Sequence, residues 1–267
     1  MGGGGEGEGD LAVFVCCSLY VQGMLWCDGI DPRYTHDRVD YGSIVMVHEL
    51  EYAKEGPVHS LFHGDGSVLY GYLAGLTERI ELVTGIIILP QRQTALVAKQ
   101  AAEADALSGG RLRLGVGVGW NRIEFEALGA EFEGRGRRME EQVAVLRALW
   151  TEELVTFGGN WHTINNVGLN PMPVQRPIPI WFGGHADAVL ERIGRLGDGW
   201  IISPNSVGSE HVASKIERIR AVAREAGRDP ASIGIETWVR LEERPIEAWL
   251  EEVRKWQATG VEEIALN

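Results

Sequence analysis

The sequence predicts an α/β fold arranged as a (β/α)8 barrel, and three features of the chain indicate it. The length of 267 residues suits such a barrel, which typically takes ~250 residues. Buried, β-branched runs alternate with segments of helical periodicity and short loops, as in a parallel sheet covered by helices. The 35 glycines suit many tight turns between strands and helices. No linker interrupts the middle of the chain, so a single barrel domain is predicted.

The first βαβ unit lies between residues 79 and 120. A β-branched run that ends at Pro90 is too apolar for a half-exposed strand, so it predicts a strand buried on both faces. A helix follows and stops at Ser108-Gly109-Gly110. The second strand alternates apolar residues with glycines, which allow a ligand to approach the backbone. The apolar positions are Ile80, Leu82, Val83, Ile86, Ile87, Ile88 and Leu89, then Leu96, Ala101, Ala104 and Leu107, then Leu112, Leu114, Val116 and Val118.

The later elements continue the same alternation. A helix with apolar residues one turn apart begins near Met139 and ends near Trp150. Residues 151–176 break the rhythm, because residues 157–162 have the composition of a hairpin, and they are predicted to be an insertion between a helix and a strand. Pro245 opens a helix, since its missing N–H costs nothing at that position. The remaining strands are predicted at 179–182, 199–203, 233–239 and 261–266, with helices after the first three.

Composition and charge argue against several classes of function. A net charge of −13 disfavours nucleic acid and anionic membrane surfaces as partners. No apolar run reaches ~18 residues, so no membrane span is expected and a cytoplasmic protein is predicted. Cys16, Cys17 and Cys27 have no histidine at ligand spacing, so they are interpreted as reduced thiols and no metal site is predicted. Residues 1–10 lack the basic region and apolar core of a signal peptide.

Residues 65–267 resemble the luciferase-like monooxygenase superfamily, in its branch of oxidoreductases that depend on the deazaflavin coenzyme F-420. The resemblance implies a (β/α)8 barrel with an insertion after the fourth helix. It also implies hydride transfer between coenzyme F-420 and a small organic substrate, and a homodimer. The motifs that carry it are residues 79–120, Glu124-Phe125, Ala127-Leu128-Gly129, 135–138, 146–150, Asn170-Pro171 with Pro173, 179–185 and 196–200.

The amino terminus departs from the family pattern. Family members begin with a strand and a helix, then a second strand that ends in an acidic residue paired with a histidine. Residues 11–15 or 25–28 are candidates for a remnant of an early strand, but neither is followed by the expected histidine. Residues 1–30 are therefore interpreted as a diverged or disordered segment, and residues 31–267 as the barrel domain. The barrel is expected to be incomplete at its first strand and helix and at its last helix.

The resemblance places the cofactor ring against the third and fourth strands. It implies a bulge at Thr84-Gly85-Ile86 with a non-proline cis peptide between Gly85 and Ile86 that supports the ring; a plain glycine in a buried strand is the alternative. Gly117 and Gly119 end the fourth strand, where the catalytic face of a barrel lies. Trp120 and Asn121 follow and are predicted to line the pocket, although a core position for Trp120 is an alternative. No catalytic acid or base is identified.

A second candidate site is the sequence Gly183-Gly184-His185, which precedes a helix. Free N–H groups and the helix dipole favour an anion there. The resemblance implies that the cofactor phosphate binds at this turn, whereas a simple helix cap is the alternative for His185. His59 and His63 lie four residues apart and are candidates for the pocket mouth, with solvated loop positions as the alternative.

Three other functions remain open. The first is a monooxygenase that uses FMN and dioxygen, and the second is a degenerate barrel that binds flavin without catalysis. The third is a phosphate-binding isomerase or aldolase, although no lysine at a strand end supports a Schiff base. The sequence also lacks the H-E-x-x-H and G-x-S-x-G motifs of zinc proteases and serine hydrolases.

Overall fold

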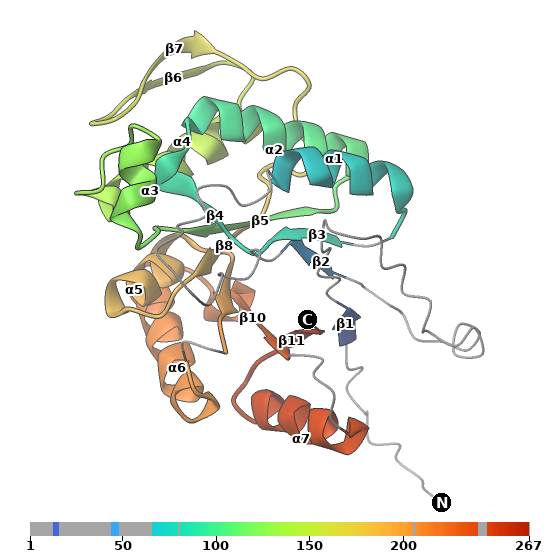
Figure 1. Ribbon diagram of the computed structural model, residues 1–267. Coiled ribbons are helices and arrows are strands. Elements are labelled where there is room, and N and C mark those ends of the chain that lie inside the picture. The colour runs from blue at the N-terminus through green and yellow to red at the C-terminus, as the bar shows by residue number, and fades with distance from the viewer. Residues whose placement is uncertain are drawn as a thin grey trace, which may run out of the picture.

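The computed structural model describes residues 13–15, 44–47, 66–79, 81–204, 207–239 and 245–266, which form an α/β fold (Figure 1). The strands are β1 (Val13–Val15), β2 (Ile44–Val47), β3 (Glu81–Thr84), β4 (Ile87–Ile88), β5 (Leu112–Gly117), β6 (Val155–Gly158), β7 (Thr163–Val167), β8 (Ile180–Gly183), β9 (Gly199–Ile202), β10 (Gly234–Val239) and β11 (Glu263–Leu266). The helices are α1 (Gly66–Leu76), α2 (Thr94–Ser108), α3 (Arg122–Ala127), α4 (Arg135–Thr151), α5 (Asp187–Leu196), α6 (Ser209–Glu225) and α7 (Ile246–Gln257), with short 3-10 helices at Leu89–Gln91 and Pro230–Ser232.

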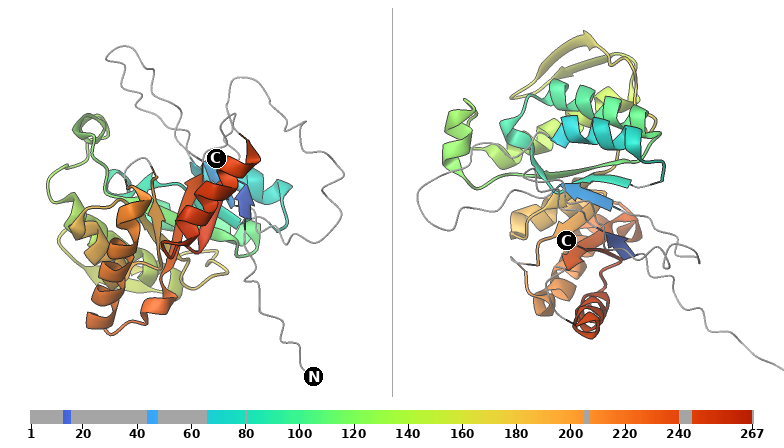
Figure 2. Two further views of the ribbon diagram at one scale, coloured as in Figure 1. Left: turned by 90° about the horizontal axis from the view of Figure 1, so that it is seen from below. Right: turned by 45° about the vertical axis from the view of Figure 1, so that its right-hand side comes forward.

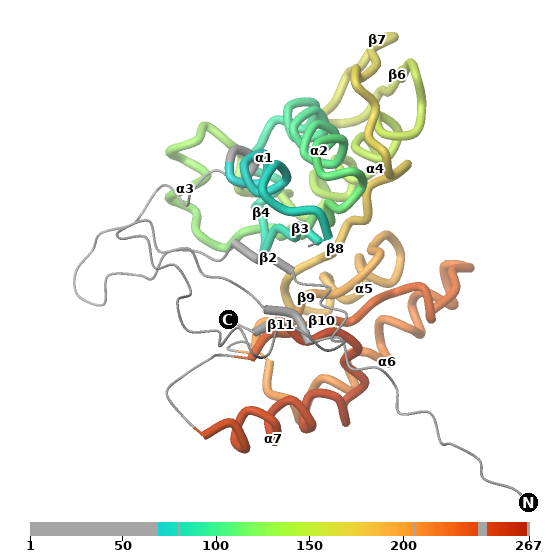
Figure 3. Tube along the Cα trace, turned by 90° about the vertical axis from the view of Figure 1, so that its right-hand side faces the viewer, coloured from blue at the N-terminus to red at the C-terminus, as the bar shows by residue number. Residues whose placement is uncertain are grey.

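The main sheet is parallel and curled, and it confirms the predicted incomplete (β/α)8 barrel. Its strands are ordered β1-β11-β10-β9-β8-β5-β3-β2, and β4 pairs with β5 beside this path. Helices α1, α2 and α4 cover one part of the sheet and α5, α6 and α7 the other, as Figures 1, 2 and 3 show from different sides. The last strand pairs with the first, since Ile264 is opposite Val13. Within the described residues β1 and β2 share no ladder, so the barrel is open between them.

The amino-terminal strands are the part of the barrel that the sequence located least well. Of the two candidate remnants, residues 11–15 contain β1, whereas residues 25–28 lie outside the described residues. The second strand, β2, was not predicted, because four apolar residues among polar ones give no periodicity from which to assign it. His48 directly follows β2 in the sequence, and it too lies outside the described residues.

Helix α2 buries two of the four apolar residues that marked it in the sequence. Ala101 and Ala104 are buried, whereas Leu96 and Leu107 are 53% and 66% exposed. The buried face also includes Ala98. Alanines allow close approach to the sheet and to α4, and this tight interface excludes the larger leucines. The predicted helix stop is correct, because Gly109 adopts the left-handed conformation at the carboxyl-terminal cap.

The insertion between α4 and β8 is confirmed. Its strands β6 and β7 form an antiparallel pair apart from the main sheet (Figure 1). Helix α4 buries Met139, Val143, Leu146 and Trp150, as its periodicity predicted. Pro245 also precedes the first residue of α7, as expected.

The interior of the barrel is filled differently at its two ends. Near the amino ends of the strands, Arg113 lies 2.9 Å from Glu81, 3.0 Å from Glu236 and 2.8 Å from Glu263. The guanidinium also lies 4.1 Å from the ring centre of Trp181. Above this ion cluster, the interior contains an apolar group formed by Val83, Trp181, Ile201, Trp238 and Ala265, with Ile86 packed against it.

Two negative findings limit the chemistry of the described residues. None of the helices that the structure describes is long and apolar enough to cross a membrane. In the same part of the chain, no three side chains of histidine, cysteine, aspartate or glutamate are grouped so that they could bind a metal ion.

Candidate functional site

Three segments with predicted site residues meet at the carboxyl ends of neighbouring strands. In the sheet, β5 lies between β4 and β8, because Val116 is opposite both Ile87 and Phe182. Residues 84–86, 117–121 and 183–185 therefore lie at the same edge of the barrel. In (β/α)8 barrels this edge carries the active site.

Thr84 and the following bulge fix the end of β3 against β5. The Thr84 hydroxyl accepts a hydrogen bond from the Gly115 N–H and donates one to the Gly115 carbonyl, both at 2.7 Å. These bonds replace ladder bonds between the pairing of Val83 with Arg113 and that of Ile87 with Val116. Only glycine fits at position 115, since an added Cβ would lie 2.0 Å from the Thr84 carbonyl oxygen. The peptide bond between Gly85 and Ile86 is cis, as the resemblance implied.

The Ile86 side chain forms an apolar floor over the strand ends. A Cβ atom at Gly117 would lie 2.1 Å from Cδ1 of Ile86, and one at Gly183 would lie 3.2 Å from its Cγ2. The absence of a side chain at Gly117 and at Gly183 therefore makes room for Ile86. Ile86 is only partly buried, so one side of its side chain borders open space at this end of the barrel.

The turn after β5 presents an exposed tryptophan. Trp120 is 73% exposed, so the alternative of a core position is wrong. Its neighbour Asn121 caps α3, because its Oδ1 accepts from the Ile123 N–H at 3.1 Å and its Nδ2 donates to Glu124 at 3.0 Å. The Asn121 side chain thus has structural partners, whereas the indole of Trp120 is free to contact a ligand.

Arg135 holds the same turn from α4, and sequence reasoning did not single it out for a role. Its Nε donates to the Gly119 carbonyl at 3.0 Å, and its guanidinium lies 3.8 Å from the ring centre of Phe132. The turn before Trp120 is therefore held by a hydrogen bond from α4. This contact leaves no pattern in the sequence, because the two partners are 16 residues apart.

The turn Gly183-Gly184-His185 leads into α5 and is open to solvent. Gly184 has a φ of 110°, which side chains rarely adopt, and Gly184 and His185 are exposed. The first four N–H groups of a helix lack intrahelical acceptors, so this terminus attracts an anion. Asp187, in the first turn of α5, carries a negative charge that would repel a bound anion.

Two residues support this turn that sequence reasoning missed. Lys215 on α6 donates from Nζ to the His185 carbonyl at 3.0 Å, which places an ammonium group beside the start of α5. From below, Nε1 of Trp200 donates to the Gly184 carbonyl at 2.7 Å. Lys215 supplies the positive charge that offsets Asp187. The turn thus fits a phosphate group by backbone donors and one cation.

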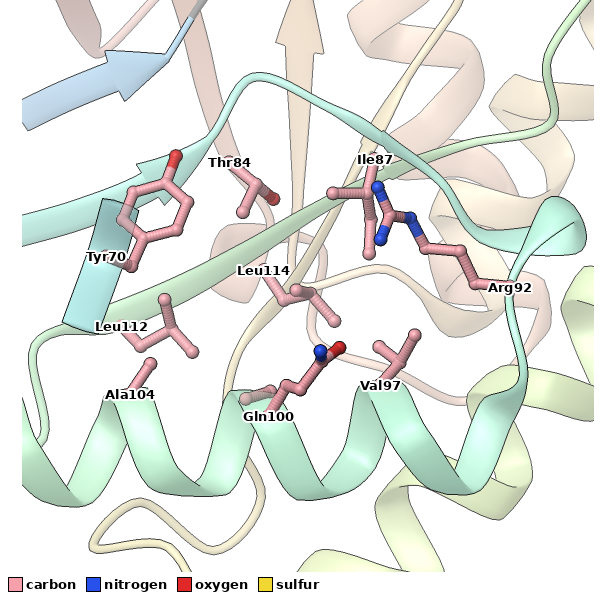
Figure 4. A pocket seen from close by; sticks show the side chains of 10 residues that line it. Tyr70, Thr84, Ile87, Arg92, Val97, Gln100, Ala104, Leu112 and Leu114 are labelled. Carbon is pink, nitrogen blue, oxygen red and sulfur yellow. The ribbon is translucent and has the colours of Figure 1, made fainter. Parts of the chain in front are cut away.

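A small cavity lies behind the site, on the helix side of β3 and β5 (Figure 4). Its volume of about 30 Å³ holds at most a few water molecules, each of which needs roughly 10–15 Å³. It is therefore too small for a cofactor ring. The lining residues include Tyr70, Thr84, Ile87, Arg92, Val97, Gln100, Ala104, Leu112 and Leu114. His59 and His63, the other candidates for the mouth, lie outside the described residues.

Comparison with known proteins identifies relatives that match most of this chain. The family model described as luciferase-like monooxygenase matches residues 48–260. An uncharacterized protein of Mycobacterium tuberculosis is 37% identical over 161 residues, which cover 60% of this chain and 54% of the relative. The FMNH(2)-dependent dimethylsulfone monooxygenase of Pseudomonas putida is 34% identical over 181 residues, or 66% of this chain and 48% of the relative. The chain thus spans about half the length of these curated relatives.

Solved structures show the same fold. The monooxygenase RslO1 from Streptomyces bottropensis superposes with a TM-score of 0.64 at 26% identity, over 82% of this chain and 66% of the other. An F420-dependent secondary alcohol dehydrogenase, solved with an F420-acetone adduct, has a TM-score of 0.68 at 19% identity and covers 85% of this chain and 84% of its own. At that identity the second match supports the fold alone.

Proposed function

Because the chain belongs to the luciferase-like monooxygenase family, we propose that it is an oxidoreductase that binds a flavin-type cofactor at the carboxyl ends of its strands. The observation that carries the proposal is the convergence of three predicted segments at one edge of the barrel. An apolar floor at Ile86 lies between glycine-rich strand ends, and an anion-attracting turn lies beside it at Gly184. A cofactor with a planar ring and a phosphate-bearing chain requires an apolar surface for the ring and an anion site for the phosphate.

The chain's own residues have separate roles in this proposal. Ile86 supports one face of the ring, and Gly117 and Gly183 make room for its side chain over the strand ends. The helix terminus at α5 and the ammonium group of Lys215 bind the phosphate. Trp120, which follows the neighbouring strand β5, offers an exposed apolar surface to a small organic substrate. The cofactor, when bound, supplies the hydride chemistry, while the protein provides binding and orientation.

Coenzyme F-420 is the first candidate for the cofactor. The run from residue 79 to 120 and the Gly183-Gly184-His185 turn resemble the deazaflavin branch of the family. The match in fold to an F420-dependent alcohol dehydrogenase, which covers most of both chains, is compatible with this choice. The reaction would then be hydride transfer between the deazaflavin and a small organic substrate.

Reduced FMN with dioxygen is the second candidate, and a specific observation favours it. The relative with a named activity at 34% identity is an FMNH(2)-dependent monooxygenase, although this chain covers only 48% of it. The same floor and phosphate turn suit FMN, because its ring is also planar and its chain also ends in phosphate.

Titration of the protein with each cofactor tests the proposal and separates the two candidates. We expect fluorescence quenching with a lower Kd for coenzyme F-420 than for FMN. Equal or reversed affinities would exclude the deazaflavin assignment and leave the flavin site intact. If neither cofactor binds, the site proposal is wrong. If one cofactor binds but no candidate substrate is reduced or oxygenated, the alternative of a degenerate barrel that binds flavin without catalysis gains support.

A homodimer is part of the same proposal. Large apolar side chains on the outer faces of α1 and α2 are exposed, namely Tyr72, Leu76, Leu96 and Leu107. A second copy of the chain would cover these side chains, because exposed apolar patches on soluble proteins commonly mark interfaces. Light scattering tests the dimer by comparing the molar mass of Leu107→Glu with that of the unchanged protein. A monomer mass for both proteins would exclude the dimer.

A further inference from the structure

The insertion hairpin is joined to the barrel by a buried hydrogen-bond chain through His162. The Nε2 atom of His162 lies 2.6 Å from Oγ1 of Thr94, and its Nδ1 lies 2.7 Å from Oε1 of Glu141. The side chains of His162 and Glu141 are only 13% and 10% exposed, and Thr94 is 4% exposed. Three elements meet here, since His162 precedes β7, Thr94 begins α2 and Glu141 lies on α4.

The Glu141 carboxylate determines which atom donates and which accepts in the hydrogen bonds of His162. Its carboxylate also accepts the backbone N–H groups of Asn160, Trp161 and His162 at 2.8–2.9 Å. Burial acts to raise the pKa of Glu141, but the bonds from the His162 ring and from these N–H groups hold it below its usual value. A carboxylate only accepts, so Nδ1 of His162 is the donor to it. In neutral histidine, Nε2 is then left to accept the Thr94 hydroxyl proton.

Gln142 extends the chain to the loop that borders the candidate site. Its Nε2 lies 3.0 Å from Oγ1 of Thr94, 3.1 Å from the Leu89 carbonyl and 3.2 Å from the Arg92 carbonyl. Gln142 is fully buried. The loop from Leu89 to Gln93 directly follows β4, which pairs with β5 at Val116 and Gly117.

The same loop also holds the turn that carries Trp120. The side chain of Gln91 donates to Glu124 at 3.1 Å, and Glu124 in turn accepts from Asn121 at 3.0 Å. Two sets of hydrogen bonds, joined through the backbone of loop 89–93, thus connect the hairpin with the rim of the barrel. The hairpin lies beyond α4 from the sheet, as Figure 1 shows, so these sets connect distant parts of the fold.

We propose that the insertion hairpin positions the loop 89–93 at the mouth of the site, and that His162 is the positioning residue. Because His162 accepts the Thr94 hydroxyl, Thr94 Oγ1 keeps its lone pairs toward Gln142. The two Nε2 protons of Gln142 are shared among Thr94 Oγ1 and the Leu89 and Arg92 carbonyls, so the position of Thr94 fixes the amide between the hairpin and the loop. Loss of the His162 ring leaves the buried Thr94 hydroxyl and Glu141 carboxylate each short of a partner, so the loop loses its fixed place.

Two pairs of substitutions test the inference in the full chain. His162→Phe keeps a ring of similar size and removes both nitrogens, and Asn165→Ala is its control at an exposed hairpin position. Thr94→Val removes the hydroxyl and keeps the shape, whereas Thr94→Ser keeps the hydroxyl. The measurements are amide hydrogen exchange at residues 89–93 and Kd for coenzyme F-420 and for FMN.

The inference predicts a specific pattern. His162→Phe and Thr94→Val should speed exchange at residues 89–93 by about tenfold and weaken cofactor binding by about fivefold. Thr94→Ser and Asn165→Ala should match the unchanged protein within about twofold. Faster exchange confined to the hairpin, with loop 89–93 protected and Kd unchanged, would overturn the inference and leave His162 as a local hairpin anchor.

The affinity part of this inference depends on the proposed function, but the exchange part does not. If the unchanged protein binds neither cofactor, the proposed function fails while the exchange comparison still decides on the hairpin. If His162→Phe does not fold, the comparison of Thr94→Val with Thr94→Ser decides instead. Equal exchange in those two variants would exclude the hydroxyl from the chain and overturn the inference.

Discussion

At the amino ends of the strands the barrel is filled by Arg113 and three glutamates, whereas at the carboxyl ends glycines surround the apolar side chain of Ile86. At the first end Arg113 and Glu236 are 2% and 0% exposed, and the guanidinium also packs on Trp181. At the second end Gly117 and Gly183 make room for the side chain of Ile86, and the nearby Trp120 is open to solvent. Removing one partner from a buried ion pair destabilises a fold, whereas a partly exposed apolar side chain beside an exposed ring can contact a ligand. The comparison therefore assigns stability to one end and binding to the other.

The largest effect expected concerns Arg113. Replacing it with methionine leaves the fully buried Glu236 and the partly exposed Glu81 and Glu263 without their cation, so unfolding free energy should fall by about 3–5 kcal/mol at pH 8. Denaturant unfolding monitored by circular dichroism measures it. Arg113→Lys is the control, because it keeps the charge and should lose less. A loss below about 1 kcal/mol for methionine would contradict the role given to the amino end.

The second effect is a pH dependence that originates at Glu236. Burial raises its pKa to about 8, against the attraction of Arg113, and Glu263 and Glu81 raise it further. The folded state therefore keeps a proton that the unfolded chain releases above its ordinary pKa of 4.5. Stability from this group is present at low pH and is lost as pH rises toward about 8, with a slope of up to about 1.4 kcal/mol per pH unit.

Glu236→Gln should flatten that slope. The glutamine cannot ionise, so unfolding free energy should vary less between pH 5.5 and about 8 than in the unchanged protein. Glu81, whose pKa burial also raises, leaves a weaker trend of the same sign. Glu217→Gln, on an exposed face of α6, is the matched control. Identical pH profiles for Glu236→Gln and the unchanged protein would show that Glu236 does not hold the proton.

The third effect lies at the junction between the two ends. Thr84→Val removes both hydrogen bonds to Gly115, so unfolding free energy should fall by about 1–3 kcal/mol. Thr84→Ser keeps the hydroxyl and should recover most of the loss. Thermal unfolding compares the three proteins. A loss in Thr84→Ser without a loss in Thr84→Val would mean that the methyl group, not the hydroxyl, stabilises this junction.

The smallest effect on the fold, and the one most specific to the carboxyl end, concerns Gly183. Gly183→Asp places a carboxylate against Ile86, next to the turn where the proposal puts the phosphate, so cofactor affinity should fall about tenfold. Because an added Cβ would lie 3.2 Å from Cγ2 of Ile86, any side chain at this position also costs some stability. Gly183→Asn has the same shape without the charge and should lose less. Fluorescence titration measures both. The same Kd in Gly183→Asp and Gly183→Asn would place the phosphate away from this turn.

The sequence pattern determined the alternation of strands and helices and the insertion, whereas the bulge at Gly85-Ile86 was implied only by the family resemblance. Periodicity reports which residues of one segment are buried, so α4 with Val143 and Leu146 was predicted correctly. It does not report how closely two segments pack, so it does not separate the buried Ala101 and Ala104 of α2 from the exposed Leu96 and Leu107.

Only the tertiary structure decided which distant residues meet. Arg113 lies in a glycine-rich strand, and its three glutamates come from three other strands, so no local spacing reveals the ion cluster. The same holds for Lys215 beside His185 and for His162 between Thr94 and Glu141. Sequence patterns record neighbours along one element, whereas these contacts depend on the order of strands around the barrel, because that order alone brings their side chains within bonding distance.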